Sequence, residues 1–444
     1  MKYSLSLPVA LALVAAMALT GCSGKASDAQ PYSQRMVESL ILQSFHDNQK
    51  TTSLDNAHFG YVPGLVAKSM LAAYNLYGIE SYWEAAKAYA DRQISDDAQQ
   101  PLRIGDNDID AINAGKIFFD LYRHSLETGD TESAGRYQRA ATYMYDKLKF
   151  HHTRIEEPLP GAGGFIHKGR YPNQMWLDGL YMGAAFLAEY EATMGEGSAE
   201  NWSDIAHQFI TIHRYTWDAD EQLNYHAWSA DPTDANSFWA KKDGPYKGTS
   251  QEFWARGEGW YFAALADVLA LMPQDHPDWQ KLLDIYRQVA AGLARRQDQS
   301  GCWYQLLRYD NTLCADGLGD TVDGQTYNVG TLPNYLESSA SSMFTYAFCK
   351  GLRLGFLPES YREVAEKAYK GLLDTFITEN PDGSINILQS CASAGLGPAK
   401  SPSRTGTINY YLCGSDTGIT NNEGKAIGAF TLACCAYELL TQQK

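Results

Sequence analysis

Apolar residues recur along most of the chain with the spacing of helices. Positions i, i+3, i+4 and i+7 are apolar in about twelve stretches, whereas the alternation typical of strands is almost absent. The pattern therefore predicts an all-α protein. The predicted helices span 31–48, 62–78, 80–96, 108–128, 131–150, 172–193, 200–217, 253–272, 278–298, 333–354, 360–378 and 424–442.

These helices are of two kinds, which alternate along the chain. The even-numbered ones, such as 172–193 and 424–442, are apolar on most sides and rich in Gly, Ala and Ser. The odd-numbered ones, such as 131–150 and 278–298, carry one apolar stripe and a charged face. A helix that is apolar all round is buried, and a striped helix lies outside. Inner helices that alternate with outer ones predict an (α/α)6 toroid, with an irregular all-α protein as the alternative.

The loops that lead into the inner helices are long. Because consecutive helices of such a ring run antiparallel, all inner helices would point the same way and their N-termini would gather at one mouth. Long loops without secondary structure usually carry function in a compact domain. We therefore expect a single cleft over that mouth. The loops are 97–107, 151–171, 218–252, 299–332 and 379–423.

The first residues predict the compartment. An apolar run from Leu5 to Leu19 follows Met1-Lys2 and is too short to span a membrane, so we interpret it as a signal peptide. Leu19-Thr20-Gly21-Cys22 resembles a lipobox, which predicts lipidation of Cys22 and an extracytoplasmic, membrane-anchored protein in the periplasm or at the cell surface. An ordinary secretory peptide is the alternative. The predicted organisation is a lipoprotein signal peptide at 1–21, a tether at 22–30 and a toroid domain at 31–444.

The charge balance is strongly acidic. The chain has 36 basic and 52 acidic residues and a formal net charge of −16, which excludes an electrostatic footprint for nucleic acid. The same charge would repel a polyuronate at long range. An acidic substrate would therefore need a local cationic pocket.

The cysteines have no metal-binding spacing. Of the eight cysteines, those after Cys22 form no C-x-x-C pair, so we predict neither a metal nor a cofactor. Cys302 with Cys314, and Cys391 with Cys413, lie in loop-like stretches where disulfides are possible in an oxidising compartment.

Ionisable residues recur at the starts of the inner helices. They are Asp110, Asp178, Arg256 and Glu337, and in a toroid all would face the same cleft. A lone acidic residue near a helix start is usually a cap, and we interpret Glu337 as a cap or a core hydrogen-bonding residue. Asp110 and Asp178 across the ring would also supply the two carboxylates that glycosidases generally need. They are therefore the candidate catalytic residues.

Aromatic and cationic residues surround these carboxylates in the sequence. Tyr171 and Trp176 offer flat apolar walls for sugar rings, and Arg256 lies between two tryptophans where it can pair with a carboxylate. The alternative for each is a packed aromatic cluster with a satisfied polar atom. The candidate substrate-binding residues are His167, Lys168, Tyr171, Trp176, His226, Trp254, Arg256 and Trp260.

Four motifs resemble the unsaturated rhamnogalacturonyl hydrolases, glycoside hydrolase family 105. They are Gly-Gly-Phe-Ile-His-Lys at 163–168, Tyr-Pro-Asn-Gln-Met-Trp-Leu-Asp-Gly-Leu-Tyr-Met at 171–182, Phe-Trp-Ala-Arg-Gly-Glu-Gly-Trp at 253–260 and Leu-Glu-Ser-Ser-Ala-Ser-Ser-Met-Phe at 336–344. The resemblance covers nearly the whole mature chain. It implies that Asp178 is the proton donor and Asp110 the second acidic residue. It also places His167, Lys168, Tyr171, His226, Arg256 and Trp260 around the sugar.

The same resemblance implies an activity. Such an enzyme releases a 4,5-unsaturated uronic acid from the non-reducing end of pectin-type oligosaccharides by hydrating the C4=C5 enol ether. An unsaturated glucuronyl hydrolase acting on ulvan or glycosaminoglycan fragments is one alternative. A non-catalytic surface glycan-binding lipoprotein is another. The sequence leaves the sugar next to the uronate and the oligomeric state open.

Overall fold

The computed structural model describes residues 30–97 and 99–442. The compact unit begins at Pro31. The predicted signal peptide, the lipidation site Cys22 and all but the last residue of the tether lie outside the described residues. Among the described residues, no helix has both the length and the apolar character needed to cross a membrane.

Six inner segments form a closed ring. Each contacts the next in chain order, and the last contacts the first. Two of them are interrupted, by a 3-10 turn at Asn113–Lys116 and by a π turn at Leu180–Ala184. The inner helices are α2 (Tyr61–Tyr77), α4 (Ile109–Ile112) with α5 (Ile117–Glu127), α7 (Leu177–Gly179) with α8 (Ala185–Thr193), α10 (Ala255–Leu271), α12 (Ser338–Arg353) and α15 (Gly424–Thr441).

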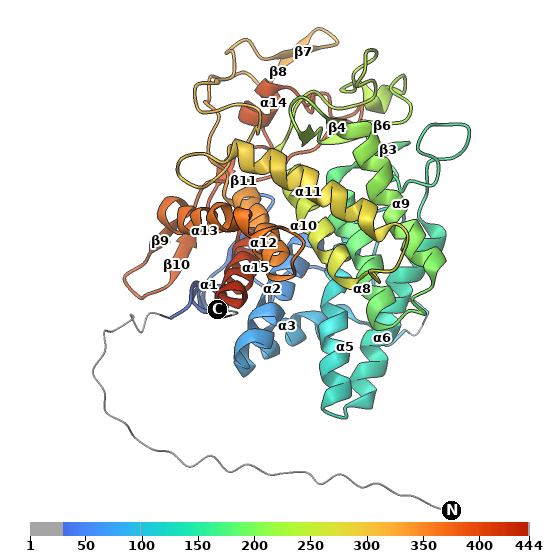
Figure 1. Ribbon diagram of the computed structural model, residues 1–444, viewed down its shortest axis with the longest axis vertical. Coiled ribbons are helices and arrows are strands. Elements are labelled where there is room, and N and C mark those ends of the chain that lie inside the picture. The colour runs from blue at the N-terminus through green and yellow to red at the C-terminus, as the bar shows by residue number, and fades with distance from the viewer. Residues whose placement is uncertain (1–29, 98, 443–444) are drawn as a thin grey trace, which may run out of the picture. The chain divides into compact units, whose positions relative to one another are not determined.

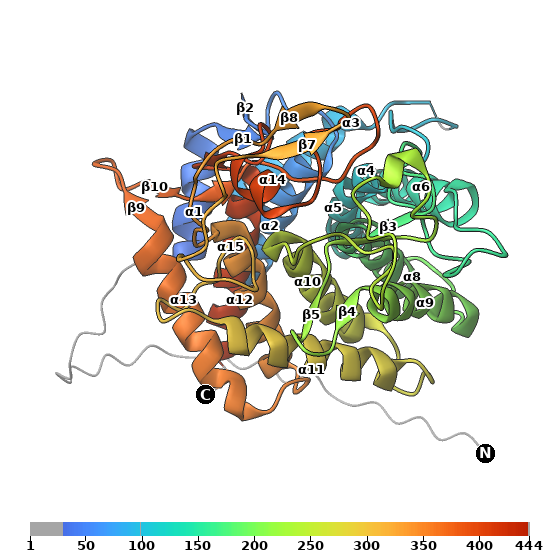
Figure 2. The same cartoon turned by 90° about the horizontal axis from the view of Figure 1, so that it is seen from above.

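Six outer helices pack against this ring, which confirms the predicted (α/α)6 toroid. Figure 2 shows α11 outside α10, for example. The outer helices are α1 (Tyr32–Leu42), α3 (Glu80–Gln93), α6 (Thr131–Asp146), α9 (Ala199–Thr216), α11 (Trp279–Arg296) and α13 (Arg362–Phe376). Small residues let the inner helices approach closely. A Cβ added to Gly64 of α2 would lie 2.4 Å from the Cα of Ala114, so this contact requires glycine.

The described loops contain a few short strands, in agreement with a mostly helical fold. Within the described residues, six short antiparallel strand pairs join one loop segment to another, or a loop segment to the end of a helix. Several of them, with α14 (Ile408–Cys413), gather at the end of the molecule that is uppermost in Figure 1. The pairs are β1 (Phe45–Asp47) with β2 (Lys50–Thr52), β3 (Gln174–Trp176) with β6 (Ala227–Ser229), β4 (Trp217–Asp218) with β5 (Leu223–Asn224), β7 (Asp320–Val322) with β8 (Gln325–Tyr327), β9 (Ile377–Glu379) with β10 (Ile385–Ile387), and β11 (Ser390–Cys391) with β12 (Ile419–Thr420).

The structure also corrects three helix boundaries, two of them because of these pairs. Helix α1 ends at Leu42 because the following residues form β1, and the stretch predicted from 172 opens with β3 before the helix begins. The stretch predicted from 333 becomes helical only at Ser338. There Glu337 is a cap as interpreted, since its side chain accepts from the backbone N–H of Ala340 at 2.7 Å and of Ser339 at 3.2 Å.

The two suggested disulfides are not formed. All seven cysteines among the described residues are free. Cys302 is buried while Cys314 is exposed. The thiol of Cys391 instead donates to the carbonyl of Ser393 at 3.1 Å. Loop position alone was therefore insufficient evidence for a bridge.

Charged side chains fill the interior of the ring below its loop-covered mouth. Lys68 pairs with Asp120 and Glu189, at 2.6 Å each. Lys116 lies 3.5 Å over the ring of Tyr181 and donates to its carbonyl at 2.6 Å. Burial lowers the pKa of Lys116 to about 7. Because these side chains come from several inner helices and are packed together, the axis of the toroid is filled at this level.

Candidate active site

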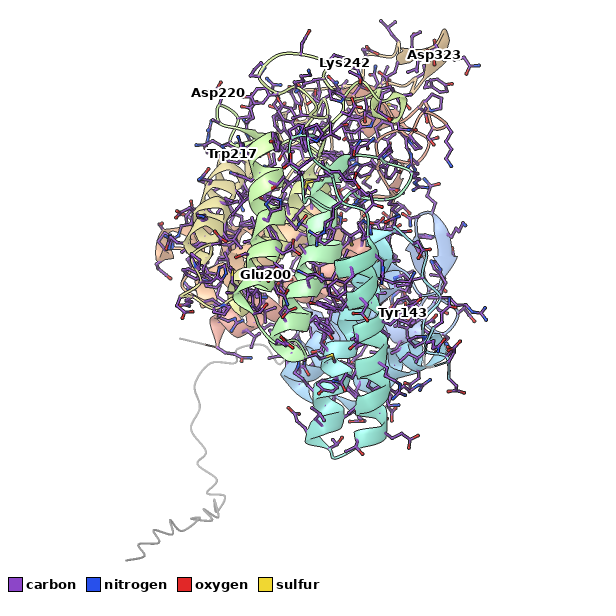
Figure 3. The ribbon with its side chains drawn as sticks, turned by 90° about the vertical axis from the view of Figure 1, so that its right-hand side faces the viewer. Tyr143, Glu200, Trp217, Asp220, Lys242 and Asp323 are labelled. Carbon is purple, nitrogen blue, oxygen red and sulfur yellow. The ribbon has the colours of Figure 1, made fainter. Side chains whose placement is uncertain are left out.

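The loops at the N-terminal ends of the inner helices enclose a cavity of about 380 Å³. In Figure 3, Lys242 of the 218–252 loop and Asp323 of the 299–332 loop lie at the same end of the molecule. The structure brings every candidate residue into the cavity lining except His226. The candidates that line it are Asp110, His167, Lys168, Tyr171, Trp176, Asp178, Trp254, Arg256 and Trp260.

His226 lies behind Asp178 and not in the lining. Strand β3, which ends two residues before Asp178, pairs with β6. The N–H of Leu177 donates to the carbonyl of His226 at 3.0 Å. The imidazole is fully buried. Its Nε2 is 3.1 Å from Oδ2 of Asp178, and its Nδ1 is 2.7 Å from the hydroxyl of Tyr411. His226 was expected to contact substrate, but its contacts are those of a residue that positions Asp178.

The partners of His226 assign its protons. Burial raises the pKa of Tyr411 well above its usual value, so the phenol keeps its proton. Among the described residues, Nδ1 of His226 is the hydrogen-bond partner of that hydroxyl, which therefore donates to it. A neutral imidazole that accepts at Nδ1 carries its proton at Nε2 and donates to Oδ2 of Asp178. Oδ1 of Asp178 is then the oxygen left to carry a transferable proton.

We expect Tyr411→Phe to lower kcat about tenfold and to change the pH profile of kcat, with little effect on KM. The phenol fixes the imidazole tautomer, and a tenfold change corresponds to about 1.4 kcal/mol, within the usual contribution of one hydrogen bond. Initial rates measured across pH check this. Tyr335→Phe is the matched control, because the buried Tyr335 hydroxyl has no hydrogen-bond partner among the described residues. A lower melting temperature with an unchanged pH profile would show that Tyr411 is only structural.

Asp110 has a different environment from Asp178. Its Oδ2 is 2.7 Å from Nζ of Lys168, and its Oδ1 is 3.4 Å from Nε2 of His167. Although burial acts in the opposite direction, Lys168 and His167 hold the pKa of Asp110 below its usual value. Asp110 is therefore a carboxylate beside a cation, whereas Asp178 faces the imidazole of His226. Such unlike surroundings separate the roles of two carboxyl groups in one site.

Stacked aromatic rings form one wall of the cavity. The ring of Trp176 lies 4.4 Å from that of His167 and nearly parallel to it, and 4.5 Å from that of Tyr171. The rings of His167 and Tyr171 are 6.0 Å apart, so the three rings form one cluster. At the floor, Trp260 lies 4.7 Å from Tyr181. Flat apolar surfaces of this kind suit the faces of sugar rings.

Arg256 is buried at the floor of the cavity, with 1% of its surface exposed. Its Nη1 donates to the carbonyl of Cys391 and to the hydroxyl of Ser339, the latter at 3.3 Å. Its guanidinium carbon lies 5.0 Å from the ring of Trp254. A guanidinium held out of water in this way is a strong partner for a carboxylate.

The lining has a net positive charge in a strongly acidic protein. By formal charge, three aspartates and five basic residues line the cavity, which leaves two positive charges in excess with Asp178 ionised and three with Asp178 protonated. This is the local cationic pocket that the overall charge required for an acidic substrate. The basic residues are Lys168, Arg170, Arg256, Arg404 and Lys425.

Three of these basic residues were missed in the sequence. Lys425 is the second residue of an inner helix, as Arg256 is, so the same criterion would have found it. Arg170 stands directly beside the recognised Tyr171. Arg404 lies in the 379–423 loop without aromatic neighbours, and only the length of that loop indicated a function.

Comparison with known proteins assigns the family. A model of Glycosyl Hydrolase Family 88 matches residues 32–314 and 325–441. The chain belongs to this family. A solved structure of a glycoside hydrolase from family 105 of C. acetobutylicum ATCC 824 is 34% identical, with a TM-score of 0.76 over 92% of this chain and 99% of its own. The resemblance to family 105 is thereby confirmed.

Two curated relatives have narrower names. The unsaturated rhamnogalacturonyl hydrolase YesR of Bacillus subtilis (strain 168) is 25% identical over 326 residues, 73% of this chain and 78% of its own. An unsaturated 3S-rhamnoglycuronyl hydrolase of Formosa agariphila is 24% identical over 246 residues, 54% of this chain and 56% of its own. The chain is therefore a glycosidase of the unsaturated uronyl hydrolase family.

Proposed function

We propose that this protein releases a 4,5-unsaturated uronic acid from the non-reducing end of pectin-type oligosaccharides that a lyase has generated. The observation that carries the proposal is a pair of carboxyl groups in unlike surroundings, in a cavity whose lining is net cationic. The name of the Bacillus subtilis relative supports rhamnogalacturonan as the source of the substrate.

The geometry suits protonation of an enol ether. Oδ1 of Asp178 delivers a proton to C4, the C4=C5 electron pair forms the new C–H bond, and positive charge develops at C5 and the ring oxygen. The carboxylate of Asp110 lies in the same cavity and stabilises that charge. Arg256 binds the uronate carboxylate.

Water completes the reaction. It adds to C5 and gives up a proton to the carboxylate of Asp178, which restores the acid. The product is a hemiketal at C5, whose ring opens to a C5 ketone and a hemiacetal at C1. Collapse of this hemiacetal to an aldehyde breaks the glycosidic C1–O bond and releases the remaining sugar as an alcohol. No covalent bond to the enzyme is needed, unlike the retaining glycosidase scheme.

Hydrolysis of a panel of substrates tests this function. We expect the purified protein to abolish the ultraviolet absorbance of the enol ether in lyase-generated rhamnogalacturonan disaccharides. Saturated disaccharides of the same composition should remain intact. Faster turnover of ulvan or glycosaminoglycan fragments would assign the activity to a glucuronate-containing substrate instead. Binding of every substrate without any loss of absorbance would show a glycan-binding protein and contradict the proposal.

A further inference from the structure

The first strand and the turn of the β7–β8 hairpin lie outside the family match, whereas β8 lies inside it. Residues 315–324, which include all of β7, fall between the two segments that the family model matches. The hairpin projects at the loop-covered end of the toroid, where Figure 1 shows it beside α14 and Figure 3 labels Asp323 at its turn. Its function must therefore be sought in what it contacts.

The hairpin holds the segment around Arg404. Oδ2 of Asp320 accepts from the hydroxyls of Thr405 and Thr407, at 2.8 Å each. Nδ2 of Asn328, just after β8, donates at 2.7 Å both to Oδ2 of Asp320 and to the carbonyl of Ser403. These hydrogen bonds hold the chain on both sides of Arg404.

Arg404 is thereby held in the lining of the active-site cavity. Its Nη2 pairs with Oδ2 of Asp416 at 2.7 Å. A Cβ added to Gly395 would lie 3.0 Å from its Nη1, so the guanidinium packs directly against the backbone there. Among the described residues, Asp416 is the one acidic side chain with which it pairs. The remaining N–H groups of the planar fork are available to a second anion.

The position of Arg404 is nearer the mouth of the cavity than that of Arg256. The Arg404 side chain is 26% exposed, while Arg256 is 1% exposed. The added Cβ at Gly395 would also lie 3.5 Å from the ring of Trp176, which places Arg404 beside the aromatic wall. A uronate bound at the floor by Arg256 would direct the next sugar along this wall and past Arg404.

We propose that Arg404 determines specificity by binding an anionic group, a carboxylate or a sulfate ester, on the sugar attached to the unsaturated uronic acid. The β7–β8 hairpin positions Arg404 through Asp320. This inference rests on the proposed function, because it takes the uronate to lie at the floor of the cavity.

Three unsaturated disaccharides test the inference. The second sugar is neutral in the first, sulfated in the second and a uronic acid in the third. The measured quantity is the ratio of kcat/KM for each anionic substrate to kcat/KM for the neutral one. We expect Arg404→Met to lower this ratio about 10- to 100-fold for the preferred anion, as for loss of a charge-assisted hydrogen bond. Comparison of the sulfated substrate with the one that carries a second uronic acid identifies which anion is preferred.

Two further variants separate position from charge. Asp320→Ala keeps the Arg404 side chain but removes the hydrogen bonds that hold its segment. We expect it to lower the same ratio about fivefold, which corresponds to about 1 kcal/mol. Lys400→Met removes a positive charge from the same loop at an exposed position outside the lining, and should leave the ratio unchanged. Melting temperatures establish whether each variant is folded. If Arg404→Met does not fold, the ratio measured with Asp320→Ala tests the inference.

The outcomes distinguish this inference from the proposed function. A wild type that hydrolyses the disaccharides, with a ratio unaffected by Arg404→Met, would overturn the inference alone. Equal losses on neutral and anionic substrates would also overturn it, because Arg404 would then contact the uronate or support the fold. Inactivity of the wild type on all three substrates would remove the proposed function, and the inference with it.

Discussion

Asp178→Asn should reduce turnover by about 10²- to 10⁴-fold, the usual contribution of a general acid. The amide has no transferable acidic proton, so C4 of the enol ether cannot be protonated. The fold should be unaffected, because the amide oxygen still accepts from Nε2 of His226. Disappearance of the enol-ether absorbance measures turnover, and titration calorimetry with the unsaturated disaccharide measures binding. We expect binding to change by less than about tenfold.

The control for this variant is the same substitution outside the cavity. Asp106 is exposed, pairs with Lys147 and does not line the site, so Asp106→Asn should retain full activity. Retained turnover in Asp178→Asn would exclude Asp178 as the proton donor. In that case Asp110, the other candidate carboxyl group, would become the residue to test.

Arg256→Met should raise KM for the unsaturated uronate about 10- to 100-fold, because a buried charge-assisted hydrogen bond to the carboxylate is lost. The same side chain also donates to the carbonyl of Cys391, so some loss of stability will accompany the change. Specificity separates the two effects. The wild type should prefer the free acid to its methyl ester, and the variant should lose that preference.

Arg256→Lys serves as the intermediate case. It keeps the charge but loses the planar fork, so it should recover part of the preference for the free acid. Thermal melting reports the structural contribution of each variant. If Arg256→Met has a lower melting temperature but still prefers the free acid to the methyl ester, the guanidinium stabilises β11 and does not bind the uronate.

The toroid could be predicted from sequence because its evidence is local. An inner helix is recognisable by apolar residues on all its sides, and its first residues then necessarily face the mouth of the ring. This is why Asp110, Asp178 and Arg256 were found together. The criterion depends on each helix alone and needs no knowledge of its partners.

The role of His226 could not be predicted in the same way. It depends on the pairing of β3 with β6, which are separated by about 50 residues, and on a phenol from α14. No local pattern specifies either contact. The β7–β8 hairpin is different, because its turn residues Asp323-Gly324 are a recognised local hairpin signal in the sequence.

The filled interior of the toroid has a consequence for how a long substrate is degraded. Tyr181 connects the cavity floor at Trp260 to the buried Lys116, so the passage is closed beneath the site. An oligosaccharide can therefore enter only by its end and cannot thread through the ring. Both products must leave through the opening by which the substrate entered. The enzyme is thus expected to act distributively, releasing the shortened chain after every cleavage instead of advancing along it.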